Sequence, residues 1–147
     1  GERNMNKNLK NKIDYDKLAE YCKENKVLAV YLFGSQLGEK TDKFSDLDLG
    51  VVFFDSEKDK LSDINFYMKF KDDLVKIFNF PKIDLIFLQN SGLKIPFEVV
   101  TKGKVLYTAD KDKRLDYEDM VICKGLDFKK ELDLYYQELE EKILSGR

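Results

Sequence analysis

Short and almost continuously apolar segments alternate with polar stretches along the first two thirds of the chain. They span Val27 to Phe33, Asp46 to Phe54, Lys82 to Leu88 and Lys104 to Thr108. Apolar runs of this length, bounded by polar or turn-forming residues, are typical of buried strands. The pattern therefore predicts four strands, and the few acidic residues inside them are exceptions that need an explanation.

The segments between these strands place apolar residues at helical spacing instead. The first predicted helix, 14–24, would begin at an aspartate cap, Asp14 or Asp16. A longer helix is predicted over about 62–79, with a serine cap at its start. Proline near the start and glycine at the end favour a short helix over 96–103.

The C-terminal third is predicted to be helical throughout. Asp110 to Lys124 and Leu126 to Leu144 indicate two helices that break at Gly125, because glycine weakens a helix interior. The second of these helices has an apolar stripe. We expect the stripe to pack in the core rather than to form a partner surface; it consists of Leu132, Tyr135, Tyr136, Leu139 and Ile143.

This alternation of helices and strands predicts an α/β (α+β) fold, a mixed β-sheet flanked by helices. A chain of 147 residues is of the size expected for one domain. We expect residues 1–12 to be a tag remnant and N-terminal tail. Residues 13–147 would form the single domain, with its C-terminal helices from about 110.

Three aspartates interrupt the second and third apolar runs. Asp46 and Asp48 are two residues apart, so on a strand they project from one face, with Cα atoms roughly 6.5 Å apart. Asp84 lies in the third run, where a carboxylate among apolar neighbours is costly unless it is paired or bound to a metal. One or two carboxylates with phosphate oxygens suit Mg²⁺, so the pattern predicts a metal–nucleotide site.

A glycine–serine turn, Gly34 and Ser35, follows the first apolar run. Gly34 has no Cβ to obstruct a close backbone approach, and the Ser35 hydroxyl adds a hydrogen-bond donor. Free N–H groups at the start of a following short helix would favour phosphate. The turn is not a Walker A loop, since no Gly-Lys-Ser/Thr sequence follows it.

The joint pattern of Gly-Ser, a ten-residue gap, Asp-x-Asp and a distal Asp resembles the DNA polymerase β-like nucleotidyltransferase superfamily. More narrowly, the chain resembles the minimal nucleotidyltransferase (MNT) antitoxins that pair with HEPN-domain toxins. The resemblance extends from about Val27 to Leu144. The segments behind the narrower likeness are Ser45 to Leu49, Phe97 to Val100, Gly103 to Tyr107, Arg114, Glu118, Leu126 to Phe128 and Tyr135-Tyr136.

The resemblance implies a nucleotidyltransferase fold and a function. Asp46, Asp48 and Asp84 would be the catalytic and metal-binding residues, with two Mg²⁺ ions, and Gly34 and Ser35 would bind the nucleotide. The substrate would be ATP, and AMP would pass to a tyrosine hydroxyl of a cognate HEPN ribonuclease toxin. The chain would thus be an antitoxin and protein adenylyltransferase. Two alternatives stay open: transfer to a small hydroxylated molecule such as an antibiotic, and a non-catalytic antitoxin that only binds its toxin.

The loop after Ser35 departs from the family pattern. Relatives commonly have an arginine in a Gly-Ser-Arg-x-x-Gly loop, whereas this chain has Gln36 and its second glycine, Gly38, one place early. The departure concerns the affinity for phosphate and leaves the three aspartates unchanged. Lys40 or Lys43 could supply positive charge there.

Charge and composition exclude several classes of function. The net charge is −2, so no strong basic field exists to hold a long nucleic acid. The chain has no histidine, and Cys22 and Cys123 lie far apart, which excludes common zinc patterns and any histidine-based triad. No signal peptide or transmembrane segment is evident, so we expect a cytoplasmic protein that does not bind membranes.

Overall fold

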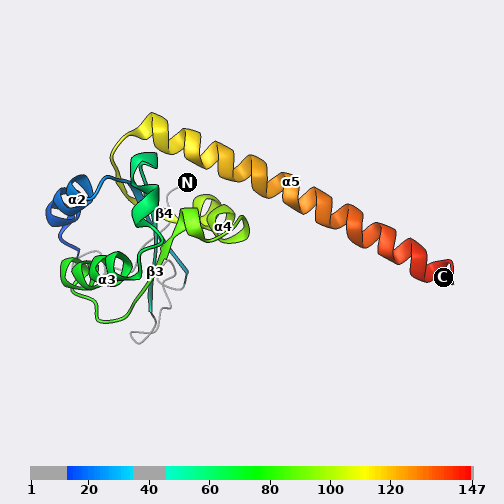
Figure 1. Ribbon diagram of the computed structural model, residues 1–147, viewed down its shortest axis with the longest axis horizontal. Coiled ribbons are helices and arrows are strands. Elements are labelled where there is room, and N and C mark those ends of the chain that lie inside the picture. Colours follow the sequence, from blue (N-terminus) through cyan, green and yellow to red (C-terminus); the bar gives the residue numbers. More distant parts are fainter. Residues whose placement is uncertain (1–12, 35–45, 147) are drawn as a thin grey trace.

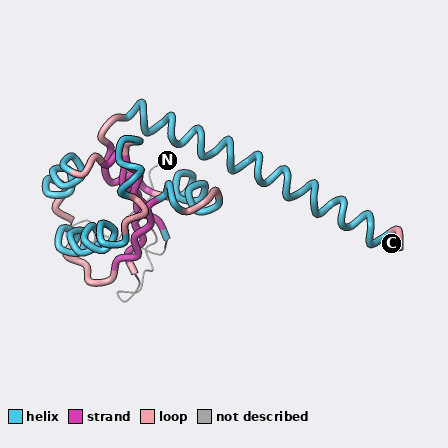
Figure 2. Tube along the Cα trace, viewed as in Figure 1, coloured by secondary structure: helices cyan, strands magenta, loops and turns pink. Residues whose placement is uncertain are grey.

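The computed structural model describes residues 13–34 and 46–146. Helices surround a four-stranded sheet, and one long C-terminal helix extends away from it (Figures 1 and 2). The strands are β1 (Val27–Phe33), β2 (Leu47–Phe53), β3 (Ile83–Phe87) and β4 (Lys104–Thr108). The predicted mixed sheet flanked by helices is therefore confirmed.

The sheet has the strand order β3-β2-β1-β4. β1 pairs antiparallel with both β2 and β4, while β2 and β3 run parallel. The predicted strands β1 and β4 have the observed bounds, but β2 and β3 are shorter at both ends than predicted. One consequence matters for the site, because Asp46 precedes β2 instead of lying within it.

Helices cover both faces of the sheet. On one face, α2 (Tyr15–Glu24) and α3 (Ile64–Phe78) bury the larger apolar cluster. On the other, α4 (Lys94–Lys102) and the start of α5 (Lys111–Leu144) cover a smaller one. Two 3₁₀ segments, η2 (Asp55–Lys60) and η3 (Leu88–Asn90), complete the connections. Alternation along β2 sends Leu47, Leu49, Val51 and Phe53 to the first face and Val52 to the second.

Side chains at the helix ends explain where α2 and α3 begin and end. The Asp14 carboxylate accepts a hydrogen bond from the Lys17 N–H at 3.1 Å, so Asp14 is the cap of α2. α3 is capped by Asp63, whose carboxylate accepts from the Asn65 N–H at 2.9 Å, and not by the predicted serine, Ser62. The helix ends at Asn79, which adopts the left-handed conformation.

The predicted break at Gly125 is wrong, since α5 is a single helix of 34 residues. Gly125 has a packing function instead. A Cβ atom at this position would collide with the ring of Phe97 on α4. The absence of a side chain therefore lets the two helices approach closely, at the expense of helix propensity.

The expectation that the C-terminal apolar stripe packs in the core is also wrong. Leu132 is 38% exposed, Tyr135 58% and Ile143 68%. Beyond the sheet, α5 projects from the rest of the fold without covering it (Figure 1). Sequence periodicity identified the stripe correctly but could not show what, if anything, lies against it.

A polar cluster attaches the first turns of α5 to the sheet. The buried Tyr31 of β1 donates its hydroxyl to Glu118 at 3.0 Å, and Arg114 donates to the same carboxylate at 2.6 Å. Burial raises the pKa of Tyr31, and the charge of Glu118 raises it further. The protonated phenol donates to Glu118, and this hydrogen bond attaches the start of the helix to β1.

The two cysteines of the chain differ in their burial. Cys22 is buried and Cys123 exposed, and neither forms a disulfide. Burial raises the pKa of the Cys22 thiol to about 12, so it is an apolar core residue.

Within residues 13–34 and 46–146, no helix has the length and apolar character needed to cross a membrane.

Replacing Gly125 tests its packing function. Alanine improves helix propensity by about 1 kcal/mol, but the added methyl group overpacks the contact with Phe97. We expect Gly125→Ala to lower the free energy of unfolding by about 1 kcal/mol or more, measured by urea denaturation. In a Phe97→Ala background the same change should stabilise the protein. Stabilisation in the wild-type background would contradict the assignment.

Candidate active site

Asp48 of β2 and Asp84 of β3 are direct neighbours in the parallel register. Both lie on the face of the sheet that also holds α4, because Leu47 and Leu49 point to the opposite face. Their carboxyl groups are within hydrogen-bonding reach of each other. The two acids that the sequence placed in separate strands thus meet side by side. Asp84 is exposed and lies on an edge strand of the described sheet.

Gly34 directly follows β1, the third of three adjacent strands, and lies against the carboxylate of Asp48. Phe33, the last residue of β1, pairs with Asp48, and Gly34 follows with a φ of +81°. A Cβ atom on Gly34 would overlap the Asp48 carboxyl oxygen Oδ2. Glycine is therefore needed here both for its backbone conformation and for the space that it leaves. Ser35, its predicted partner in the turn, lies outside the described residues.

Asp46 is near the pair but is not equivalent to it. It precedes β2 and is exposed, and its charge contributes to the raised pKa of Asp48. Within the described parts of the chain, however, no three carboxylate, histidine or cysteine side chains form a group that could hold a metal. The structure therefore brings Asp48 and Asp84 together and leaves Asp46 beside them. Asp46 is not aligned with the pair because β2 begins one residue after it.

Burial and like charges make Asp48 an unusual carboxylate. Desolvation, followed by the charges of Asp84 and then of Asp46, raises the pKa of Asp48 to about 6. At neutral pH several negative charges therefore stand close together without a compensating cation among the interactions described. A bound divalent cation would remove this repulsion.

The donor set fits magnesium. Mg²⁺ binds through one or two carboxylates and completes its octahedron with water and substrate phosphate oxygens. Asp48 and Asp84 supply two adjacent carboxylates, and the absence of a side chain at Gly34 leaves room for the Asp48 carboxylate. Soft ligands are absent from this group, which is consistent with a hard cation.

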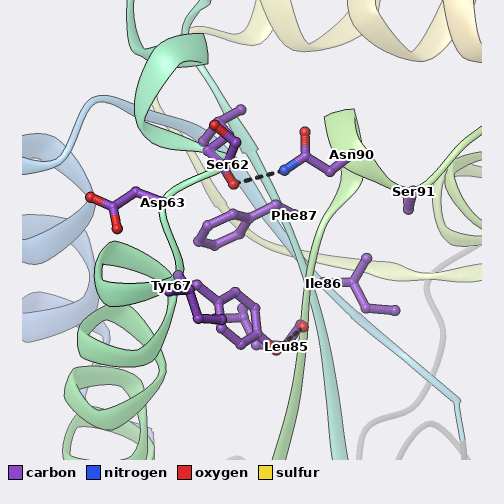
Figure 3. A pocket seen from close by; sticks show the side chains of 10 residues that line it. Ser62, Asp63, Tyr67, Leu85, Ile86, Phe87, Asn90 and Ser91 are labelled. Carbon is purple, nitrogen blue, oxygen red and sulfur yellow. Dashed lines mark hydrogen bonds between the residues drawn. The ribbon is translucent and has the colours of Figure 1, made fainter.

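A pocket of about 400 Å³ lies beside the same edge strand, between β3 and the start of α3 (Figure 3). Tyr67 reaches across from α3 and donates its hydroxyl to the backbone oxygen of Leu85 at 2.6 Å. Burial raises the pKa of Tyr67, and the charge of Asp84 adds to the effect. Asn90 closes the upper end by donating to the Leu61 carbonyl at 2.8 Å (Figure 3). Helical periodicity gives no sign of the polar contact that Tyr67 makes with the edge of β3, so the sequence did not predict it.

Comparison with protein families establishes the class of the chain. Residues 16–112 match the model described as polymerase beta, nucleotidyltransferase. The match spans more than half of the chain, so the protein belongs to this nucleotidyltransferase family. The superfamily expected from the sequence motifs is confirmed. No curated protein sequence matches the chain.

Several solved structures share the fold. A chain from a mutant of the MntA–HepT toxin–antitoxin complex aligns with a TM-score of 0.61 at 20% identity, covering 90% of this chain and 99% of that one. A toxin–antitoxin structure with AMP-PNP gives 0.61 at 21% identity, with the same coverage. A structure of the tri-AMPylated Shewanella oneidensis HEPN toxin with its MNT antitoxin gives 0.56 at 22%, covering 88% and 95%. At these identities the likeness is one of fold.

The space at Gly34 can be tested by substitution. We expect Gly34→Ala to destabilise the protein by more than about 2 kcal/mol, since the methyl group meets Asp48 and the positive φ is strained. Gly92→Ala is the matched control, because Gly92 also has a positive φ but no neighbouring atom within 4 Å of the added Cβ. Equal losses in the two variants, measured by urea denaturation, would contradict a special constraint at Gly34.

The raised pKa of Asp48 predicts a pH dependence of stability in buffer with a metal chelator. The folded protein keeps this proton up to about pH 6, whereas the unfolded chain releases it near 3.8. Stability contributed by this group therefore falls as pH rises through that window. Asp48→Asn should gain stability relative to wild type over the same range, by less than about 1 kcal/mol because water screens the site.

The control for this measurement is Asp127→Asn, at an exposed position on α5. Its difference from wild type should not change between pH 4 and 7. A flat or inverted pH profile of the stability difference between Asp48→Asn and wild type would contradict the raised pKa of Asp48.

Proposed function

We propose that this protein is an antitoxin that acts as a protein adenylyltransferase. It would transfer AMP from ATP to a tyrosine hydroxyl of a cognate HEPN ribonuclease toxin and thereby silence it in the cytoplasm. The observation that supports this most directly is the row formed by Gly34, Asp48 and Asp84 across three adjacent strands in a chain of the nucleotidyltransferase family.

The likeness in fold to toxin–antitoxin complexes supports the choice of acceptor. One of those structures contains AMP-PNP, and another contains a tri-AMPylated HEPN toxin beside its MNT antitoxin. The position of Asp84 is consistent with an acceptor that is itself a protein. Asp84 is exposed on an edge strand of the described sheet, where a side chain from another molecule can approach it.

The reaction joins the acceptor oxygen to the α-phosphorus of ATP. The bond between that phosphorus and the pyrophosphate oxygen breaks, and pyrophosphate leaves with the electron pair. Asp84 would receive or relay the proton of the tyrosine hydroxyl. Gly34 would let the triphosphate approach the backbone closely, and Ser35 would donate to it.

Asp48 and Asp84 would hold Mg²⁺, with Asp46 as a further ligand for a second ion. When bound, the metal would neutralise charge on the triphosphate and on the departing pyrophosphate. The carboxylates of Asp48 and Asp84 would orient the nucleotide relative to the acceptor, since both face the same side of the sheet. Positioning of this kind supplies a large part of the rate in phosphoryl transfer.

Substitution of the carboxylates tests the proposed reaction. We expect Asp48→Asn and Asp84→Asn each to reduce AMP transfer by more than about 100-fold, because the nucleotide loses a charged ligand. The assay is intact mass spectrometry of the product of the adjacent reading frame after incubation with this protein, ATP and Mg²⁺. Circular dichroism should show both variants folded. Near-normal transfer by either one would exclude the assignment.

Asp127→Asn serves again as the control and should transfer AMP at the wild-type rate. A cell-protection assay separates catalysis from simple binding. If Asp48→Asn loses transfer but still protects cells that express the neighbouring protein, the chain is a non-catalytic antitoxin. Loss of both together supports the adenylyltransferase.

A further inference from the structure

After the polar residues of its first turns, one face of α5 is mainly apolar, but only the first half of the helix is covered. At 100° per residue, Tyr117, Val121 and Gly125 share a side with Phe128 and the residues beyond it. In the first half this face packs on the fold, where Val121 is buried and Gly125 meets the ring of Phe97 of α4. The intramolecular interface therefore continues into a surface with no described neighbour.

We call the uncovered part the distal face of α5. Its exposed apolar side chains are Phe128, Leu132, Tyr135, Tyr136, Leu139 and Ile143. Their spacing follows the alternation of three and four residues by which helices interdigitate. The segment spans 16 residues, so the face is about 24 Å long. A surface of this length that is bounded by charged residues is of the kind that binds a second helix.

The charges beside the distal face disfavour a second copy of this chain. Glu131 and Glu138 flank the apolar residues on one side, which Lys142 shares at the far end, and Lys129 and Glu140 lie on the other. If two copies paired antiparallel with their centre between Leu134 and Tyr135, each Glu131 would face Glu138 of the other copy. If two copies paired in parallel, Glu131 would lie opposite Tyr136 of the other copy and Glu138 opposite Ile143. Neither glutamate would then form an ion pair. The acidic side therefore suits a partner with basic residues.

We infer that the distal face of α5 binds an apolar helical surface of the acceptor protein, with lysine or arginine residues of that surface opposite Glu131 and Glu138. The identity of the partner as the AMP acceptor rests on the proposed function, whereas the surface and its charge do not. Attachment of the first half of α5 through Tyr31 and Glu118 would hold the acceptor at a defined position relative to the sheet.

The test compares two faces of the same helix. Leu132→Asp with Leu139→Asp changes the distal face, and Leu126→Asp with Leu134→Asp makes the same change on the opposite side, where the leucines are also exposed. Binding to the purified product of the adjacent reading frame is measured by calorimetry without ATP. We expect the distal pair to weaken binding by at least about 100-fold and the control pair by less than about threefold. Because all four leucines are exposed, the variants should remain folded.

Charge reversal provides a second measurement. Glu131→Lys with Glu138→Lys should weaken binding of the same protein by about tenfold at low salt and by less at high salt. Light scattering should show the free protein as a monomer. A dimer that Leu132→Asp with Leu139→Asp dissociates would identify a second copy as the occupant and overturn the inference.

Unchanged binding by the distal variant, or no binding by the wild type, would also overturn the inference. Its failure is distinguishable from that of the proposed function. If the wild type binds through the distal face but transfers no AMP, the docking surface stands and the adenylyltransferase assignment fails. If the wild type transfers AMP and the distal variant also transfers AMP and binds normally, the adenylyltransferase assignment stands and the docking surface fails.

Discussion

The parallel pairing of β2 with β3 is the interaction on which the candidate site depends. It places Asp48 directly beside Asp84, so two carboxylates share one face of the sheet. Proteins rarely bring like charges together without a function, because repulsion and desolvation both oppose it. Here the buried leucines on the opposite face of β2 hold the strand in register, and apolar packing offsets the electrostatic cost.

Two glycines show how missing side chains shape this fold. Gly34 leaves room for the Asp48 carboxylate at the end of β1, and Gly125 leaves room for Phe97 under α5. The first position accommodates a carboxylate of the candidate site, while the second lets the long helix pack on the fold. In both cases a neighbouring side chain distant in sequence requires glycine. At Gly125 the effect of glycine on the helix backbone is secondary to this requirement.

Catalysis and recognition would use separate parts of the molecule. The acids lie on β2 and the edge strand β3, and the distal face of α5 lies on a helix that extends away from the sheet (Figure 1). The Tyr31–Glu118–Arg114 cluster links them, because it fixes the first turns of the helix to the central strand. Such an arrangement lets a partner be held by a large surface while a single side chain enters the site.

The chain's own pattern determined the four strands, the cap at Asp14 and the candidate acids, because strand alternation, capping and the spacing of Asp46 and Asp48 are local properties. Those signals were not enough to tell that Gly125 continues a helix, that Asp46 falls just outside β2 or that the stripe around Leu132 is exposed. Each of these depends on contacts between distant segments: Phe97 against Gly125, the register of β2 with its neighbours, and the end of the sheet beneath α5. Periodicity states which side of an element is apolar, and only tertiary packing decides what covers it.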